Sequence, residues 1–227
     1  MIDNQRVVAL VPIKEHSERV HGKNFRDFCG RPLYEHIVHT LHRTYAVDEI
    51  VIDTDSPRVL YEGASLSDKV RVIERPEEVR GDHTSMNRVI AHDLSQTEGD
   101  IYLQTHATNP LLTSHTIEKG LLRFVESEDG DSLFGVSKHQ SRFYRADGTP
   151  MNHDPDRLIR TQDLDPVYEE NSCIYVFTKE SFARTGARIG KHPILFPISG
   201  MEAVDIDNEL TFRLAELLTL YSLADEA

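Results

Sequence analysis

The sequence is poor in cysteine: its 227 residues include only Cys29 and Cys173. Two thiols are too few for a disulfide framework and are compatible with a reducing compartment. No stretch approaches the roughly 20 apolar residues that are needed to cross a bilayer. Residues 1–6 are polar and lead directly into a short apolar run, which is not the pattern of a signal peptide. We therefore expect a soluble protein of the cytosol.

Positive charge is also scarce, because 25 Lys and Arg residues are outnumbered by 38 Asp and Glu residues, giving a formal net charge of −13. A field of that sign disfavours nucleic acid or an anionic membrane as the main partner. The acidity either serves solubility alone or is an adaptation to salty surroundings, and neither decides function. A polyanionic substrate would require cations gathered at one place.

Two common nucleotide-binding motifs are missing as well. The sequence has no G-x-x-x-x-G-K-[ST] loop, which argues against a P-loop NTPase. It has no G-x-G-x-x-G either, so a Rossmann dehydrogenase is unsupported. Because no internal repeat, low-complexity tract or interdomain linker is visible, residues 1–227 are predicted to form one domain.

Apolar runs alternate with helical patterns along most of the chain. Strands are expected at Val7–Ile13, Ile50–Ile52, Val70–Ile73, Ile101–Gln104, Ser132–Val136 and Cys173–Phe177. Helices are expected at Pro32–Tyr45, Met86–Leu94, Ser114–Val125 and Asn208–Leu223, the last with an apolar face of Leu210, Phe212, Leu214, Leu217 and Leu218. This order predicts an α/β fold with three layers, a mainly parallel sheet with helices on both faces. Ligands of such sheets bind beyond the carboxyl ends of the strands.

The alternation stops between Lys138 and Glu170. This stretch is polar, contains Pro150, Pro155 and Pro166, and lacks a long apolar period. It is either a flexible surface insertion or an arm that contacts a second subunit.

The loop after the first strand concentrates positive charge. Lys14, Arg19 and Lys23 follow the strand at the carboxyl edge of the sheet, where arginine can clamp phosphate oxygens and lysine can add a point charge. A solvated charged turn is an equally good interpretation of the loop alone, since Glu15 and Glu18 lie among the cations.

Asp205 and Asp207 form a pair of carboxylates near the end of the chain. Alternation along a short strand would point both to the same face, where they suit Mg²⁺. Taken alone, the pair is better explained as a cap of the helix that starts near Asn208. Asp53 and Asp55 form a second pair, for which shaping a strand-end turn is the favoured interpretation.

No residue is identified as a general base. His106 is a candidate by location only, and a solvated loop histidine is the favoured interpretation. His36, His39 and His42 recur every three residues on the first helix, where a half-exposed polar face is favoured over a metal site. Cys173 lies in an apolar strand and is expected to be an inert core residue.

Seven short motifs, in the right order along nearly the whole chain, resemble the acylneuraminate (CMP-sialic acid) cytidylyltransferase family. They are Val11-Pro12-Ile13-Lys14 continued by Ser17, Arg19 and Gly22-Lys23-Asn24; Gly30-Arg31-Pro32-Leu33; Asp53-Thr54-Asp55-Ser56; Arg75-Pro76 with Gly81-Asp82; Gln104-Thr105-His106-Ala107-Thr108-Asn109-Pro110-Leu111; Arg160-Thr161-Gln162 with Pro166, Tyr168 and Asn171; and Val204-Asp205-Ile206-Asp207. One such match is weak, whereas seven in order are specific.

The resemblance implies a fold of the nucleotide-diphospho-sugar transferase type, with CTP and Mg²⁺ at the carboxyl edge of a Rossmann-like sheet. It implies a homodimer in which residues 138–170 form the dimerisation arm. By position in the motifs, the nucleotide would be held by Lys14, Ser17, Arg19, Lys23, Asn24 and Asp82, of which Lys14, Arg19 and Lys23 would act in catalysis. The acceptor would be held by Gln104, Arg160, Gln162 and Tyr168, and the metal by Asp205 and Asp207.

Three departures from the family pattern bear on the acceptor. Lys14-Glu15-His16 replaces Arg-Gly-Gly, Leu112 stands where Arg is common, and Asn171-Ser172 replaces Asn-Gly. The main hypothesis is CMP transfer from CTP to a nonulosonic acid, whether sialic, legionaminic or pseudaminic. The alternatives are a cytidylyltransferase that acts on a phosphonate or another small acid and, more remotely, a non-catalytic nucleotide-binding protein.

Overall fold

The computed structural model describes residues 2–17 and 19–225. Glu18, one of the two acidic residues among the cations of the first loop, lies outside the described residues. Among the described helices, none combines the length and the apolar character that a membrane span requires.

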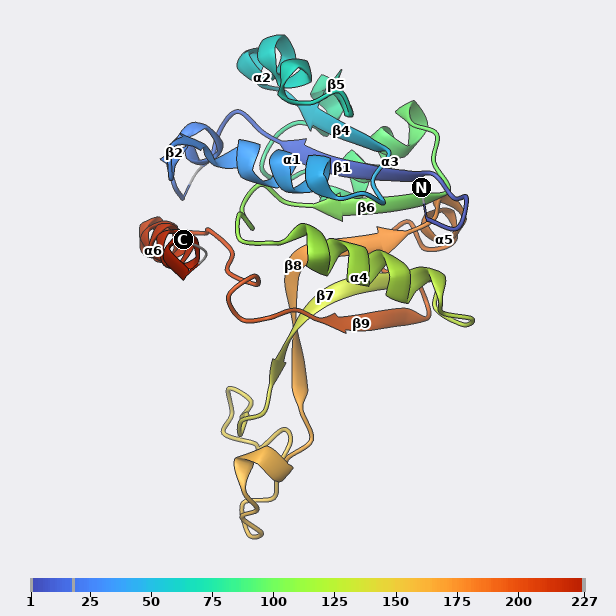
Figure 1. Cartoon of the computed structure of the whole chain (residues 1–227). Helices are drawn as coiled ribbons and strands as arrows, with labels where there is room; N and C mark the ends of the chain where they lie inside the picture. Colours follow the sequence, from blue (N-terminus) through green and yellow to red (C-terminus); the bar gives the residue numbers. More distant parts are fainter. Residues whose placement is uncertain (1, 18, 226–227) are drawn as a thin grey trace.

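The core of the molecule is a mainly parallel sheet, as predicted (Figure 1). Its strands follow the spatial order β5-β4-β1-β6-β8-β7-β9, and only β8 runs antiparallel to its neighbours. The strands are β1 (Val7–Ile13), β4 (Glu49–Thr54), β5 (Val70–Glu74), β6 (Ile101–Thr105), β7 (Ser132–His139), β8 (Val167–Phe177) and β9 (Pro193–Pro197).

Helices cover both faces of the sheet, which confirms the three-layer α/β architecture. One face packs against α1 (Leu33–Arg43), α2 (Pro57–Glu62) and α4 (Ser114–Val125), and the other against α3 (Met86–Gln96) and α5 (Lys179–Thr185). A small hairpin, β2 (Asp27–Phe28) with β3 (Arg31–Pro32), packs beside α6 (Glu209–Asp225). Short 3₁₀ turns lie at η1 (Lys23–Phe25), η2 (Gly63–Leu66), η3 (Glu77–Val79) and η4 (Thr161–Asp163).

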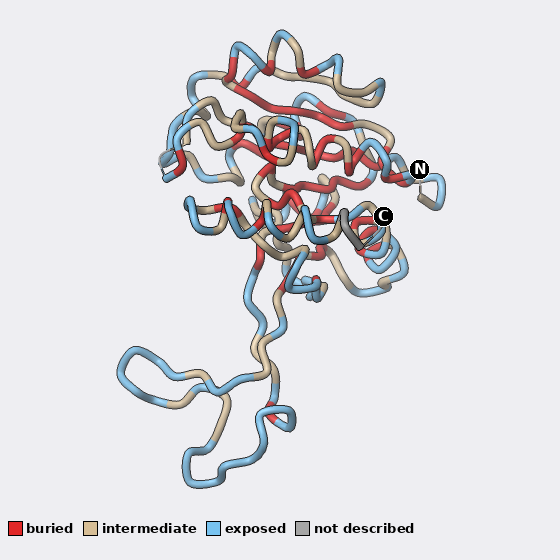
Figure 2. Tube along the Cα trace, turned by 60° about the vertical axis from the view of Figure 1, so that its left-hand side comes forward, coloured by how far each residue is buried: buried red, intermediate tan, exposed pale blue. Residues whose placement is uncertain are grey.

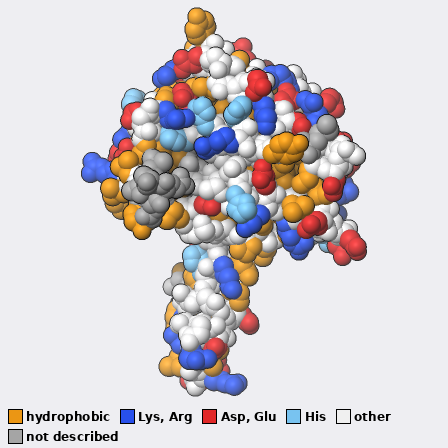
Figure 3. All heavy atoms as spheres, in the orientation of Figure 1, with side chains coloured by type: hydrophobic (Ala, Val, Ile, Leu, Met, Phe, Trp, Pro, Cys, Tyr) orange, Lys and Arg blue, Asp and Glu red, His pale blue; other side chains and the backbone are white. Residues whose placement is uncertain are grey.

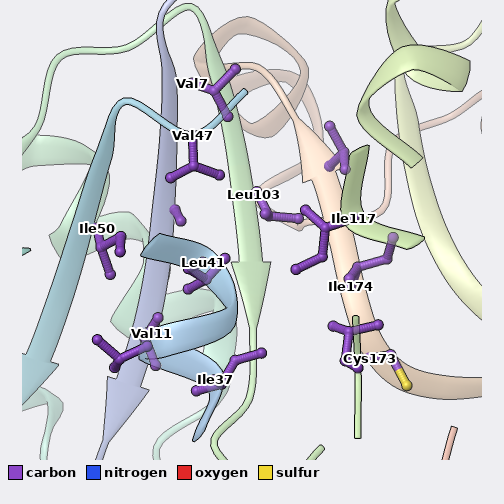
Figure 4. Packing of buried hydrophobic residues seen from close by; sticks show 14 of the residues in the cluster. Val7, Val11, Ile37, Leu41, Val47, Ile50, Leu103, Ile117, Cys173 and Ile174 are labelled. Carbon is purple, nitrogen blue, oxygen red and sulfur yellow. The ribbon is translucent and has the colours of Figure 1, made fainter. Parts of the chain in front are cut away.

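Strand β1 is buried on both faces, which explains its unbroken apolar run. Val11 belongs to the cluster under α1 and α4, whereas Val8 and Leu10 belong to the cluster under α3 and α5. Figure 4 shows Ile37 and Leu41 of α1 directed at the sheet, one helical turn apart. Because its middle is held from both sides, the sheet is a firm base for the loops at its carboxyl edge.

The strands β7 and β8 extend further than the sequence predicts. They were expected to end at Val136 and to start at Cys173, but they continue as a two-stranded stem to His139 and from Val167. Glu169 and Glu170 pair there with Ser137 and Val136. The stem lies beyond the helical layers, so its residues need no apolar alternation and give no strand signal.

The stem carries residues 140–166 away from the body as a projecting arm (Figures 1 and 2). The arm has its own hydrogen bonds: Asn152 accepts from the amide of Phe143 (3.0 Å) and donates to the carbonyl of Ser141 (2.8 Å). Residues 138–170 therefore have the shape of an arm, which was one of the two interpretations of this stretch. Its role in dimerisation stays a prediction.

Helix α6 starts one residue after the predicted position, but its apolar face is only partly buried. Phe212 and Ala215 are buried against the β2–β3 hairpin, whereas Leu210, Leu214 and Leu217 are exposed. The predicted helix is therefore confirmed, and part of its apolar face is left uncovered by the body.

Candidate active site

A cavity of about 320 Å³ lies at the carboxyl edge of β1. Residues of the first loop form one wall, and segments that follow β5 and β6 form the others. The lining consists of Pro12, Lys14, Ser17, Arg19, Val20, Lys23, Asn24, Arg75, Asp82, Met86, His106, Ala107 and Thr108. The cavity thus brings together all six residues that the family resemblance implies for the nucleotide.

Contacts from distant parts of the chain hold the first loop in place. The amide of Glu15 donates to Asp55 (2.7 Å), and the side chain of Asn24 donates to the carbonyl of Lys14 (3.0 Å). Val20 is buried in the cluster with Phe28. The loop is therefore anchored to the body, although His16, Arg19 and His21 are exposed, and Asp55 shapes the region as the sequence suggests.

Each of the three loop cations contacts an oxygen on another wall. Lys14 forms an ion pair with Asp82, Arg19 with Asp207 (2.8 Å), and Lys23 Nζ donates to the carbonyl of Ile206 (2.5 Å). Burial lowers the pKa of Lys23, and the nearby carboxylates of residues 205 and 207 oppose that shift. The cluster therefore keeps positive charge at this edge of a strongly acidic protein.

Asp205 and Asp207 face the cation cluster, but residues 204–207 form no strand. The segment is instead held by a hydrogen bond from the amide of Ile206 to the carbonyl of Thr108 (2.9 Å). The helix cap is provided by Asn208, whose side chain accepts from the amide of Thr211 (2.9 Å). The two carboxylates are therefore not needed as the N-cap.

The half-buried carboxylate of Asp205 suits a hard cation. Its pKa is raised, chiefly by burial and further by Asp207, although a hydrogen bond from Thr108 opposes the shift. Its Oδ1 atom is buried and has no hydrogen-bond partner among the described residues. An orphaned carboxylate oxygen beside a second carboxylate is a donor set that fits Mg²⁺.

A second acidic cluster lies behind the cavity and involves Asp53, which the sequence assigns to a turn. Its carboxylate forms a buried ion pair with Arg75, and Arg75 also donates to its backbone carbonyl (3.2 Å). Burial first, and then the charge of Asp53, raise the pKa of Asp93 far above its usual range. Asp53 is therefore an anchor for Arg75 on the cavity wall rather than a turn residue.

His106 lines the cavity and contacts Gln104, which lies just outside it. Gln104 Nε2 donates to the carbonyl of Thr105 (2.8 Å) and lies 3.1 Å from His106 Nε2. Burial, with the charges of Arg188 and Lys23, lowers the pKa of His106 to about 3. The ring is therefore neutral at physiological pH, and since it is half-buried at the cavity, the expectation of a solvated loop histidine is wrong.

Sequence reasoning missed Arg188, which lies between α5 and β9. Its Nη1 donates to Gln104 Oε1, and its guanidinium carbon lies 3.9 Å from the ring centre of Tyr175. The Tyr175 hydroxyl donates to Glu170. No periodic pattern surrounds Arg188, and its partner Gln104 is 84 residues away, so the sequence offers no local signal.

The other three residues assigned to the acceptor do not reach the cavity. Arg160 and Gln162 lie in the arm, where Arg160 forms an exposed ion pair with Asp163 (2.7 Å). Tyr168 lies on the exposed stem. Of the four candidate acceptor residues, only Gln104 adjoins the cavity of its own chain, so the other three depend on the prediction that the arm reaches a partner.

The three histidines of α1 line a separate hollow of about 720 Å³. His36 contacts the carbonyl of Phe28 (2.7 Å), and His42 contacts Ser67 (2.7 Å). Figure 3 shows histidine, lysine and arginine side chains gathered on this face. The expected polar face is confirmed. Cys173 is buried, and burial raises its pKa to about 12, as expected for an inert core thiol.

Comparison with known proteins gives consistent results. A family model described as cytidylyltransferase matches residues 8–220. Pseudaminic acid cytidylyltransferase of Campylobacter jejuni is 22% identical over 93% of this chain and 95% of that protein. CMP-N,N'-diacetyllegionaminic acid synthase of Legionella pneumophila is 24% identical over 94% of this chain and 96% of that protein. N-acylneuraminate cytidylyltransferase of Streptococcus agalactiae is 24% identical over 90% of this chain but 51% of that longer protein.

Solved structures support the fold. CMP:2-keto-3-deoxy-manno-octonic acid synthetase complexed with CTP superposes with a TM-score of 0.68 at 17% identity, covering 96% of this chain and 99% of that one. The 4-diphosphocytidyl-2C-methyl-D-erythritol synthase from Anaerococcus prevotii gives 0.70 at 12% identity, covering 96% and 98%. At these identities the likeness concerns the fold alone, and it confirms the expected α/β class.

Proposed function

We propose, because this chain belongs to the cytidylyltransferase family, that it transfers CMP from CTP to a nonulosonic sugar acid and releases pyrophosphate. Family membership makes it a CTP-dependent nucleotidyltransferase. The finer assignment to sugar acids is supported by relatives whose names specify pseudaminic, legionaminic and N-acylneuraminic acids. Among these acids we leave the choice to experiment.

The cation cluster around the cavity is the observation that carries this proposal. Lys14, Arg19, Lys23 and Arg75 line one hollow of a protein whose net charge is −13. A triphosphate needs such a local excess of positive charge, since phosphates are held by bidentate arginine contacts and lysine point charges. The hollow also lies at the carboxyl edge of the sheet, where ligands of this architecture bind.

In the proposed reaction, a hydroxyl oxygen of the acceptor attacks the α-phosphorus of CTP. The new bond joins that oxygen to phosphorus, the bond from phosphorus to the α,β-bridging oxygen breaks, and pyrophosphate leaves with that electron pair. The hydroxyl proton passes to solvent. Positioning and charge neutralisation supply most of the catalysis of such transfers. Lys14, Arg19 and Lys23 would offset the charge that builds on the leaving group.

Asp205 and Asp207 are the residues that we propose for Mg²⁺, since the donor set fits a hard cation. When bound, the ion would neutralise phosphate charge. Arg19 would then exchange its contact with Asp207 for a phosphate oxygen, because an arginine paired with an acid in the same hollow is available to a stronger anionic partner.

We also propose that the protein is a homodimer and that its arm reaches the partner's cavity. The support is that Arg160 and Gln162 lie far out on the arm, which exposes the apolar side chains of Met151, Leu158 and Ile159. Light scattering across a concentration series tests the oligomeric state. A cytosolic location agrees with the need for CTP and with the two free thiols.

The test is pyrophosphate release with Mg²⁺, with CTP, UTP, ATP and GTP each offered against separate pools of nonulosonic acids and phosphonates. We expect turnover with CTP and one sugar acid. Turnover with phosphonates alone would overturn the sugar-acid assignment and leave cytidylyl transfer in place. Tight CTP binding without turnover on any pool would identify a non-catalytic binding protein.

A further inference from the structure

The guanidinium of Arg188 is held by neighbours on two strands, and its backbone is held by a helix. Nη1 donates to Gln104 Oε1 on β6, and the group stacks on the Tyr175 ring of β8 at 3.9 Å. The backbone amide of Arg188 donates to Asn87 Oδ1 on α3 (3.3 Å). Such a group is preorganised, because its position does not depend on a flexible side chain finding its own partner.

The Arg188 guanidinium has no carboxylate at ion-pair distance within residues 2–17 and 19–225. Glu170 accepts the hydroxyl of Tyr175, and its charge favours the protonated form of Arg188 without forming an ion pair. Burial lowers the pKa of Arg188, which reflects the cost of keeping its charge there. Partly buried arginines are ordinarily paired, so the arrangement favours an anion supplied from outside the chain.

The arginines of the nucleotide cavity differ from Arg188 in this respect. Arg19 pairs with Asp207 and Arg75 pairs with Asp53. The direct contacts of the Arg188 guanidinium within the described residues are with neutral groups, an amide oxygen and an aromatic ring. Among the described residues it therefore has no carboxylate at ion-pair distance, although the charge of Glu170 still acts on it from further away.

His106 links Arg188 to the nucleotide cavity. The imidazole lines that cavity, lies 3.1 Å from Gln104 Nε2, and meets the Tyr175 ring edge-on with centroids 6.5 Å apart. Lys23 on one side and Arg188 on the other both disfavour its protonation. The unpaired guanidinium thus lies one side chain beyond the cations that we propose for the phosphates.

We infer that Arg188 binds the carboxylate of the acceptor, with Gln104 as the positioning residue that orients the guanidinium. The inference rests on the proposed function, since it requires an acidic acceptor. In a nonulosonic acid the carboxylate is attached to the same carbon as the anomeric hydroxyl. Fixing the carboxylate therefore fixes the attacking oxygen, and alignment of that kind is a large part of catalysis.

The experiment combines variants of Arg188 with an acceptor whose carboxylate is replaced by a carboxamide. For the unaltered protein we expect kcat/KM to fall about 100-fold on that replacement, as expected when a charged hydrogen bond is lost. For Arg188→Met we expect kcat/KM for the acid to fall about 100-fold, and acid and amide to differ less than about 3-fold. Arg188→Lys keeps the charge but cannot bind a carboxylate in a bidentate way, so kcat/KM for the acid should fall about 10-fold.

Affinity for CTP, measured by calorimetry without acceptor, separates this role from a structural one. We expect it to be unchanged in both Arg188 variants and in Arg184→Met, a matched change on α5 where the side chain is exposed. Gln104→Glu gives Arg188 an internal partner and should raise the acceptor KM about 100-fold while leaving CTP affinity intact.

Two results overturn the inference. One is an Arg188→Met variant that still prefers the acid over the amide as strongly as the unaltered protein. The other is equal loss of CTP and acceptor binding in that variant, which would make Arg188 a structural support of the sheet edge. A failure of the proposed function looks different, because the unaltered protein would then turn over no nonulosonic acid at all, and the inference would fall with it.

Discussion

The first loop, residues 14–24, and the arm, residues 140–166, are both polar and irregular, yet they are held in opposite ways. Contacts of the loop reach across the chain: the Lys23 ammonium meets Ile206 at a separation of 183 residues, and Glu15 meets Asp55 at 40. Contacts of the arm stay inside it, such as those of Asn152 with Ser141 and of Gln140 with Gln162.

The difference teaches where polar residues gain a function. The loop lies at the carboxyl edge of a sheet whose neighbouring segments supply walls, so its cations enclose a cavity. The arm leaves the sheet on a two-stranded stem and meets no wall of its own chain (Figure 1). If the arm contributes to a site, that site has to be completed by another chain. The predictions below test this contrast.

The largest effect is expected for Asp207→Ala. The substitution removes a proposed metal ligand and the partner of Arg19, so we expect turnover to fall at least about 1000-fold. The fold should stay intact, because Asn208 rather than Asp207 caps α6. Pyrophosphate release and circular dichroism measure the two quantities.

The matched control is Glu62→Ala, which removes the acid of an exposed arginine–carboxylate pair, with Arg58 on α2, outside the proposed site. We expect turnover to stay within about 3-fold, since an exposed ion pair contributes little. A fully active Asp207→Ala variant would remove that residue from the metal site and weaken the contrast between loop and arm.

The next effect is expected for Lys23→Met. Lys23 is half-buried between Asp205 and Asp207, and its charge is maintained although burial lowers its pKa. Removing it should lower kcat/KM about 100-fold, because a preorganised cation in a site of this kind contributes that much. Lys119→Met, an exposed change on α4, serves as the control. Equal effects of both changes would show that net charge alone matters.

A smaller effect, on stability, is expected for Asp93→Asn. Burial and Asp53 raise the pKa of Asp93, so the folded protein keeps a proton that the unfolded chain loses near pH 4. The folded state therefore binds more protons, and its stability falls as pH rises through neutrality, by up to about 1.4 kcal/mol per pH unit. Asparagine cannot ionise, so the variant should have a flatter profile between pH 5 and 8.

Urea unfolding at several pH values measures the slope. Asp147→Asn is the control in the arm, because Asp147 is fully exposed and its pKa is lowered by a hydrogen bond from Thr149, so it stays ionised throughout this range. If the stability of Asp93→Asn and of the unaltered protein depended on pH in the same way, the folded protein would not hold a proton on Asp93.

Much of the fold could be predicted because the core obeys local rules. Val7–Ile13 and Ser114–Val125 were predicted with their observed bounds, since a doubly buried strand and an amphipathic helix each carry their own pattern. The stem of β7 and β8, the short strand β9 and the helix α5 were not, because exposed or short elements take their form from neighbours. The exposed leucines of α6 show that a pattern predicts a helix but not what covers it.

In the candidate site, too, residues within a sequence motif could be predicted, whereas residues positioned by distant neighbours could not. Motif resemblance named the loop cations, which line the cavity, and Asp205, whose charge acts on Lys23. It could not reveal Arg188, whose position is set by Gln104 and Tyr175 on two strands. It also could not assign the pKa of His106, because that value depends on burial and on two cations from different segments.

The smallest effect is expected for Arg160→Ala, which tests the arm's independence from the body. Arg160 is largely exposed and forms an ion pair with Asp163, three residues further along the chain. The free energy of unfolding should change by less than about 0.5 kcal/mol, as for exposed ion pairs in general. Urea unfolding measures it, with Arg75→Ala as the opposite case, since breaking a buried pair costs about 3–5 kcal/mol. A loss above about 1 kcal/mol for Arg160→Ala, outside the range of an isolated surface pair, would mean that the arm supports the body, and the contrast with the first loop would fail.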